Sequence, residues 1–72
     1  MRLENRVRER RLERGWTQEE LARAVGVSRQ TVVAIEKGGY EPSVRLAIEL
    51  ALAFGGGVDD LFWLTEMKGE KT

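Results

Sequence analysis

The stretch that decides the fold is residues 17–38, TQEELARAVGVSRQTVVAIEKG, which is typical of a short helix, a tight turn and a second short helix. Thr17 can cap the first helix, and Glu20 can reach back to the backbone N–H of this cap, which completes a capping box. Gly26 ends the helix, because glycine adopts positive φ angles without a Cβ penalty. Ser28 then caps the second helix.

Each of these two predicted helices carries apolar side chains at helical spacing. They are Leu21, Ala22 and Val25 in the first helix and Val32 and Ile35 in the second. Side chains at this spacing share one face of a helix, so the two helices are expected to pack their apolar faces together. The polar residues that open the second helix then point away from the core. Proteins that read the major groove of DNA present side chains from a second helix in this way.

This segment resembles the helix-turn-helix of the Cro and phage-repressor (XRE-like) family of bacterial and phage regulators. The resemblance runs from about residue 6 to about residue 62, and it rests on the combined spacing of Thr17, Gln18, Leu21, Ala22, Gly26, Ser28, Val32, Ile35, Glu36 and Gly38. It implies a compact all-α domain of five helices that binds double-stranded DNA and regulates transcription. The alternative is an ordinary helical hairpin whose polar residues are merely solvated.

The resemblance also implies roles for individual residues at the DNA. Base-reading positions open the second helix of the motif, and they are Arg29, Gln30, Thr31 and Ala34. Arginine pairs well with guanine and glutamine with adenine, but Arg29 can equally bind a phosphate, and Thr31 a phosphate or a base. Phosphate-binding positions would fix the register on the duplex. These are Thr17, Gln18, Ser28, Lys37, Tyr40, Ser43 and Arg45.

A further implication of the resemblance concerns an ion pair. Members of the family pair an arginine of the helix before the motif with a glutamate near the end of the recognition helix. Arg11 and Glu36 stand at the matching positions. The implied role is structural, because the pair would fix the recognition helix, residues 28–37, against the first helix. Removing one partner of such a buried pair would leave the other charge buried alone.

The residues on either side of the motif predict three further helices. They are expected at residues 4–14, at residues 43–54 with Ser43 as the cap, and at residues 58–62 after a run of glycines. Residues 62–65 can be extended and form a short C-terminal strand, and residues 66–72 are expected to be a frayed tail. The apolar positions expected in the first helix are Leu3, Val7 and Leu12. Together the elements predict one domain over residues 1–72.

The helix predicted over residues 43–54 is apolar nearly all round, so one face is expected in the core and another near a partner. A 72-residue chain buries a limited core, and formation of a homodimer would help to stabilise it. Besides the outer face of this helix, the residues expected in the dimer interface are Leu61, Phe62, Trp63, Leu64 and Met67. The alternative is that these side chains pack within their own chain.

Composition excludes several classes of function. The chain has no cysteine and no histidine, which excludes disulfides and thiolate metal sites and removes the commonest general base. The sequence therefore predicts that the protein is not an enzyme and uses neither a metal nor a cofactor. No apolar run approaches the ~20 residues that span a bilayer, and the N-terminus lacks the apolar segment of a signal peptide. We expect a cytoplasmic, nucleoid-associated protein without membrane contact.

Charge is unevenly distributed along a chain whose net charge is zero. Residues 2–45 hold ten Lys and Arg against seven Asp and Glu, whereas residues 46–72 hold two against five. The part that carries the motif is therefore basic and the remainder acidic. Such asymmetry suits a protein with a DNA-binding face and a separate association face, although an excess of three charges also arises by chance.

Two functions follow from these features. The first is a sequence-specific regulator, and more specifically a repressor, which binds an inverted-repeat operator as a homodimer with the recognition helix in the major groove. The second is an antitoxin-like or partner-dependent interaction module, in which the C-terminal segment binds another protein. In that case Trp63, Leu64 and Met67 would be the anchors for the partner.

Overall fold

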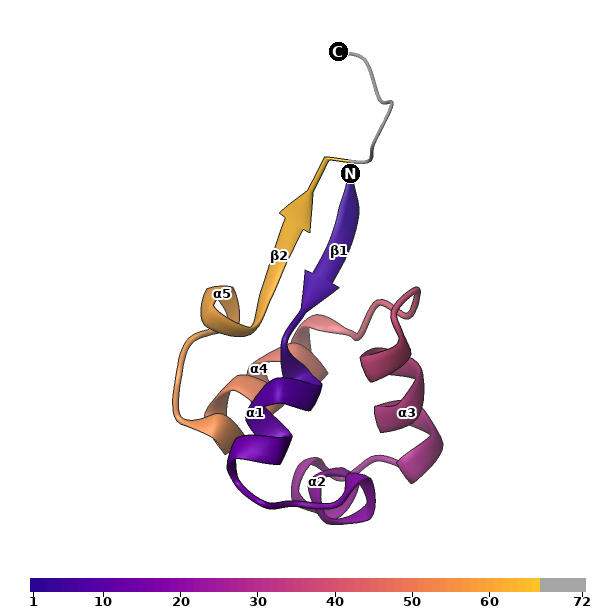
Figure 1. The fold of residues 1–72 in the computed structure, drawn as a ribbon, viewed down its shortest axis with the longest axis vertical. Coiled ribbons are helices and arrows are strands. Elements are labelled where there is room, and N and C mark those ends of the chain that lie inside the picture. The colour runs from indigo at the N-terminus through magenta and orange to yellow at the C-terminus, as the bar shows by residue number, and fades with distance from the viewer. Residues whose placement is uncertain (67–72) are drawn as a thin grey trace.

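The computed structural model describes residues 1–66 of the chain. Within this range five helices pack together, and two short strands form a ribbon that projects from them (Figure 1). The elements are β1 (Arg2–Asn5), α1 (Val7–Glu13), α2 (Gln18–Val25), α3 (Arg29–Lys37), α4 (Val44–Phe54), α5 (Val58–Leu61) and β2 (Phe62–Thr65). The predicted five-helix architecture and the predicted C-terminal strand are both confirmed.

Helices α2 and α3 form the helix-turn-helix, and the local signals act as predicted. The Thr17 hydroxyl accepts a hydrogen bond from the N–H of Glu20 at 3.0 Å, while the Glu20 carboxylate accepts one from the N–H of Thr17 at 2.8 Å. Gly26 ends α2 with a φ angle of 73°, which lets the chain turn sharply into α3. The Ser28 hydroxyl then accepts a hydrogen bond from the N–H of Thr31 at 3.2 Å. The capping box and the second cap are therefore present.

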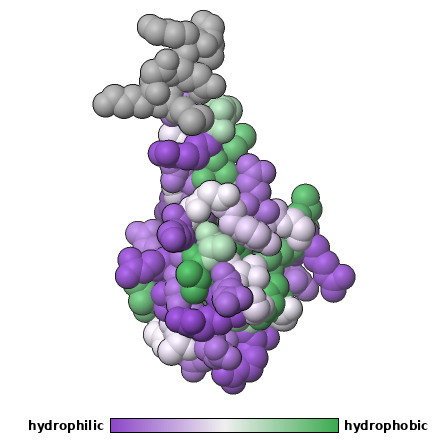
Figure 2. All heavy atoms as spheres, turned by 90° about the vertical axis from the view of Figure 1, so that its right-hand side faces the viewer, coloured by the Kyte–Doolittle hydropathy of each residue, from purple (hydrophilic) through white to green (hydrophobic). Residues whose placement is uncertain are grey.

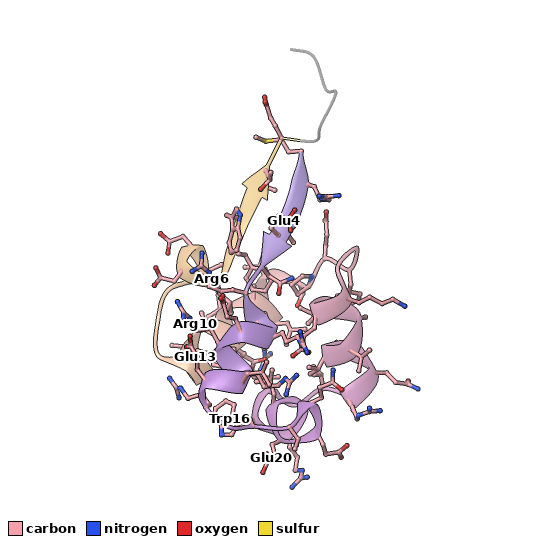
Figure 3. The ribbon with its side chains drawn as sticks, in the orientation of Figure 1. Glu4, Arg6, Arg10, Glu13, Trp16 and Glu20 are labelled. Carbon is pink, nitrogen blue, oxygen red and sulfur yellow. The ribbon has the colours of Figure 1, made fainter. Side chains whose placement is uncertain are left out.

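The hydrophobic core lies where α1 to α4 meet. Its largest fully buried side chains are Val7, Leu21, Val32, Ile35 and Leu50. Trp16, at the end of the loop that follows α1 (Figure 3), packs against this core and stacks on the ring of Phe54 with 5.8 Å between centroids. The apolar faces of α2 and α3 thus meet as their spacing predicts, and their polar faces are left for solvent.

Helix α4 divides its apolar side chains between two faces. Leu46, Leu50, Ala51 and Phe54 are buried in the core. The opposite face carries an exposed stripe of Val44, Ile48 and Leu52, whose exposed fractions are 77%, 44% and 72%. The core face agrees with the expectation for this helix, while the expectation that the other face lies near a partner stays a prediction.

The N-terminal segment differs from the helix predicted over residues 4–14. Arg2–Asn5 is a strand, and it pairs antiparallel with β2 so that Leu3 lies opposite Leu64. Helix α1 starts only at Val7. The strand forms because its backbone pairs with a segment at the other end of the described chain. Such a distant partner leaves no periodic signal in the local sequence.

Asn5 marks the change from strand to helix. Its side-chain oxygen accepts a hydrogen bond from the N–H of Val7 at 3.0 Å, as turn-forming asparagines do. This residue type was the signal that could have placed the helix start correctly. Leu12, which was expected on the apolar stripe of the first helix, is 54% exposed. Val7 is buried as predicted, while Leu3 packs against the core from β1.

The C-terminal elements are held to the rest of the fold by hydrogen bonds. The carbonyl of Leu61 accepts a hydrogen bond from the N–H of Arg6 at 3.0 Å, which joins the end of α5 to the start of α1. The Arg14 guanidinium donates to the carbonyl of Phe54 at the end of α4. Glu66 is irregular, and residues 67–72 of the predicted frayed tail lie outside the described residues.

The contrast between two leucines gives a test of this core. We expect Leu21→Ala to lower the free energy of unfolding by about 2–5 kcal/mol, because it empties a fully buried site. The same substitution at the exposed Leu12 should change it by about 0.5 kcal/mol or less. Urea denaturation at a fixed protein concentration measures both values. Equal losses from the two variants would contradict the described core.

Candidate nucleic-acid interface

The first turn of α3 presents polar side chains to solvent. Arg29 and Gln30 are exposed, and Ala34 is half-buried one turn further along the helix. Thr31 is also half-buried, and its hydroxyl lies 3.0 Å from that of Ser28, so the two hydroxyls are hydrogen-bonded to each other. The side of the molecule that carries α3 is mainly hydrophilic (Figure 2). Arg29 and Gln30 are thus the exposed residues among the predicted base-reading positions.

A hollow of about 470 Å³ lies beside this turn, between the α2–α3 turn and the start of α4. Thr31, Tyr40, Ser43 and Arg45 line it, so four predicted DNA-contacting residues meet around one space. The Ser43 hydroxyl caps α4 by accepting a hydrogen bond from a backbone N–H. The first backbone N–H groups of a helix are free of partners within that helix, and they can donate to an anion. The hollow therefore combines hydroxyl groups, a helix start and a cation, together with the carboxylate of Glu49.

Arg45 lines this hollow and makes only a weak, exposed ion pair. Its guanidinium lies 3.5 Å from the carboxylate of Glu49, but the arginine side chain is 87% exposed. Exposed ion pairs of this kind contribute little to stability, so the guanidinium can leave Glu49 for another anion at small cost. Lys37, in the last turn of α3, is also exposed.

Three cations at the N-terminal end of the chain have partners within it. Arg2 pairs with Glu4 at 3.1 Å. Arg10 pairs with Glu13 at 3.2 Å, and both are labelled in Figure 3. The Arg6 guanidinium lies over the ring of Trp63, 4.7 Å from its centroid, as in a cation–π interaction. On α3, Arg29 and Lys37 are exposed, whereas Arg45 on α4 keeps its exposed pair with Glu49.

Two predicted phosphate-binding residues have other partners at the start of α2. The Thr17 hydroxyl serves as the helix cap, as described above. The Gln18 side-chain amide donates a hydrogen bond to the carboxylate of Glu36 at 3.2 Å. Gln18 is therefore oriented by the recognition helix itself. Neither residue lines the hollow beside α4.

Arg11 and Glu36 form a buried ion pair that joins α1 to α3. Arg11 Nε lies 2.7 Å from one carboxylate oxygen, and Nη2 lies 3.2 Å from the other, so the contact is bidentate. The two side chains are only 9% and 4% exposed. Arg11 Nη1 also donates to the carbonyl of Trp16 at 2.7 Å. Each guanidinium nitrogen and each carboxylate oxygen thus has a hydrogen-bond partner, which a buried charge requires.

The residues predicted for the dimer interface separate into two groups. Leu61 and Phe62 are only 2% and 8% exposed and belong to the core of their own chain, which fits the alternative that they pack within it. Their place in a dimer interface stays a prediction. Trp63 and Leu64 remain 38% and 59% exposed. Met67 lies outside the described residues. The two buried residues stand where α5 ends and β2 begins.

A different apolar surface, which we call the apolar groove, lies between β1, α4 and α5. It has a volume of about 210 Å³ and is lined by Leu3, Pro42, Val44, Ala47, Ile48, Val58 and the edge of Phe62. The outer face of α4 was predicted from the sequence, but Leu3, Pro42 and Val58 were not assigned to any surface. They come together only because β1 pairs with β2 beside α4.

Two further observations concern the described residues 1–66. No group of three or more histidine, cysteine, aspartate or glutamate side chains in this range is arranged to hold a metal ion. None of the helices in this range is both long enough and apolar enough to cross a membrane.

Comparisons with known proteins agree with this geometry. A helix-turn-helix family model matches residues 7–61. The uncharacterized HTH-type transcriptional regulator YgzD of Bacillus subtilis is 50% identical over 64 residues, which cover 89% of this chain and 97% of that protein. The cryptic phage CTXphi transcriptional repressor RstR of Vibrio cholerae is 35% identical over 57 residues, which cover 79% of this chain and 51% of that protein.

Solved structures show the same fold. The crystal structure of the clp gene regulator ClgR from Corynebacterium glutamicum matches with a TM-score of 0.69 and 35% sequence identity. The match covers 75% of this chain and 57% of that chain, so the chain spans less than two thirds of the solved protein. The likeness therefore concerns the helix-turn-helix part of that regulator.

The Arg11–Glu36 pair supplies the test of this subsection. We expect Glu36→Ala to lower the free energy of unfolding by about 3–5 kcal/mol, because it leaves the Arg11 guanidinium buried without its carboxylate. As a control, Glu49→Ala removes one partner of an exposed pair and should cost about 0.5 kcal/mol or less. Thermal melts at equal protein concentration measure both. A melt that is unchanged by Glu36→Ala would reject the structural role of the pair.

Proposed function

We propose that this protein, which belongs to the helix-turn-helix family of Cro and phage-repressor regulators, is a sequence-specific repressor. Membership of this family makes it a DNA-binding transcriptional regulator. We propose further that it binds an inverted-repeat operator as a homodimer. The observation that carries this proposal is the position of the exposed first turn of α3 next to the hollow lined by Thr31, Tyr40, Ser43 and Arg45. Binding to chromosomal DNA would place the protein at the nucleoid.

In this proposal the first turn of α3 enters the major groove. Arg29 and Gln30 are exposed there, and their side chains match the acceptor and donor patterns of guanine and adenine. Ala34 would contact only a thymine methyl group or leave space. Thr31 stands between the two kinds of contact, because it belongs to α3 and also lines the hollow.

The hollow beside α4 would receive a backbone phosphate. Tyr40, Ser43 and Arg45 offer hydroxyl groups and a guanidinium, and the start of α4 offers backbone N–H groups. Phosphate contacts of this kind position a protein on the duplex without reading its sequence. Because the whole chain has no net charge, we expect modest affinity for unrelated DNA and therefore a strong reliance on base contacts.

The homodimer is supported by the apolar groove and the exposed stripe of α4. Val44 and Ile48 belong to both, and Leu52 extends the stripe by one turn. A contiguous apolar surface of this kind marks an interaction site. In a symmetric dimer the same surface meets itself, and two recognition helices can then reach successive major grooves about one DNA turn, roughly 34 Å, apart. Such a dimer on a promoter would block transcription by occupancy.

The partner-dependent alternative receives less support. It relies on Trp63, Leu64 and Met67 as anchors for another protein, but Trp63 already packs against Arg6 of its own chain. The name of the 35% identical relative RstR, a phage transcriptional repressor, favours repression. The observations together favour the DNA-binding homodimer.

Base reading can be separated from phosphate binding by two alanine variants. Selection from a random DNA pool with the wild-type protein first supplies the operator, which we expect to be an inverted repeat. Gln30→Ala should then relax preference at one position in each half-site and weaken operator binding by about 1–3 kcal/mol per base contact. Lys37→Ala should weaken operator and unrelated DNA alike. A Gln30→Ala variant with unchanged base preference would contradict the assignment.

The dimer surface can be tested by placing a charge on it. We expect Ile48→Asp to convert the dimer to a monomer at micromolar concentration, because a carboxylate would be buried at the apolar interface without a partner. The matched control is Leu12→Asp, which adds the same charge at an exposed leucine on α1 outside the groove. Sedimentation equilibrium distinguishes the two. A wild-type protein that stays monomeric at this concentration would contradict the homodimer.

A further inference from the structure

The side-chain amide of Asn5 joins three parts of the fold. Its nitrogen donates a hydrogen bond to the carbonyl of Ile35 in α3 at 3.1 Å. Its oxygen accepts a hydrogen bond from the N–H of Val7 at the start of α1 at 3.0 Å. The backbone of the same residue belongs to β1 and lies opposite Phe62 of β2. One partly buried side chain therefore connects the ribbon, α1 and the recognition helix.

The carbonyl that Asn5 binds lies at the end of α3 that is fixed to the body. The Ile35 side chain is fully buried, and its carbonyl also accepts a hydrogen bond from the N–H of Gly38 at 3.2 Å. The next residue, Glu36, holds Arg11 of α1. By contrast, Arg29 is exposed at the other end of the helix, about 9 Å away along its axis at about 1.5 Å per residue. A small rotation at Ile35 therefore displaces the base-reading side chains.

Asn5 also lies beside the proposed dimer surface. Side chains alternate along a strand, so Leu3 and Asn5 share one face of β1. Leu3 and Phe62 both line the apolar groove, and Phe62 is the residue opposite Asn5 in the ribbon. In Figure 1, α3 starts next to α2 and ends on the side from which the ribbon projects. Asn5 thus stands between the groove and the fixed end of the recognition helix.

We propose that Asn5 is a positioning residue, whose hydrogen bond to the Ile35 carbonyl fixes the recognition helix relative to the dimer surface. This role rests on the proposed DNA-binding homodimer. In such a dimer the orientation of each α3 relative to the interface sets how both helices enter the DNA. Asn5 would therefore govern the preference for an operator over unrelated DNA, although its side chain is engaged far from the base-reading turn.

The chemistry of the amide allows its two hydrogen bonds to be separated. Asparagine offers both a donor and an acceptor, whereas ionised aspartate offers acceptors only. Asn5→Asp keeps the size of the side chain and its acceptor for the N–H of Val7, and a carboxylate is favourable at a helix start. It removes the donor and turns an acceptor toward the Ile35 carbonyl. The variant thus retains the cap of α1 and loses the contact with α3.

The matched control is Thr65→Asp. It adds the same negative charge to an exposed position of the ribbon, in β2, away from α3. Both variants are compared with the wild-type protein at one salt concentration and at a temperature where melts show all three to be folded. The probes are the duplex selected from a random pool by the wild-type protein and an unrelated duplex of the same length.

We expect Asn5→Asp to bind the selected duplex about tenfold more weakly than Thr65→Asp does, which is the size of effect that one hydrogen bond produces. Its affinity for the unrelated duplex should equal that of the control, because phosphate contacts are unchanged. Sedimentation should show the same dimer for both variants. A lower melting temperature with an unchanged ratio of the two affinities would make Asn5 merely structural and overturn the proposal, as would loss of the dimer.

Amide hydrogen exchange gives a readout that does not depend on DNA. Asn5→Asp should speed exchange of the N–H of Gly38, which shares the Ile35 carbonyl with Asn5, whereas Thr65→Asp should leave it unchanged. Unchanged exchange in both variants would overturn the proposal. If the wild-type protein selects no duplex while Asn5→Asp still speeds this exchange, the proposed function fails and the contact that holds α3 is upheld.

Discussion

The bidentate ion pair between Arg11 and Glu36 is the constraint on which the rest of the site depends. It links α1 to α3 within a small core, and the same guanidinium holds the carbonyl of Trp16, just before the cap of α2. The carboxylate also receives the amide of Gln18. One pair of charges therefore makes contacts with α1, with α3 and with the start of α2. Burial makes the geometry of this pair strict, because each buried charge is stable only while its hydrogen-bond partners keep their positions.

The two ends of the recognition helix consequently differ in their contacts with the rest of the protein. Its C-terminal turn is fixed by Glu36 through side-chain charge and by Asn5 through a backbone carbonyl. Its N-terminal turn is capped by Ser28 and packs into the core through Val32. The same turn presents Arg29 and Gln30 to solvent. The exposed polar side chains of the first turn therefore belong to a helix whose other end is joined to the body by an ion pair and a hydrogen bond.

The apolar residues near the C-terminal end of the described chain show how tertiary structure separates residues that look alike in sequence. Leu61, Phe62, Trp63 and Leu64 form one apolar run, yet the first two are buried in the core and the last two are more exposed. The groove instead combines Leu3 of β1 with Val44 and Ile48 of α4 and Val58 of α5, which are three separate elements. No periodic pattern within one segment could group them, because the grouping depends on the pairing of β1 with β2.

Local interactions were readable from the sequence alone. The caps at Thr17, Ser28 and Ser43, the turn at Gly26 and the inward faces of α2 and α3 all depend on residues within a few positions of one another, so composition and spacing determined them. The tertiary structure decided that residues 2–5 form a strand, that Gln18 binds Glu36, and that Thr31, Tyr40, Ser43 and Arg45 share one hollow. These features join parts of the chain that local spacing cannot relate, and their stability comes from burial and from hydrogen bonds that exist only in the packed fold.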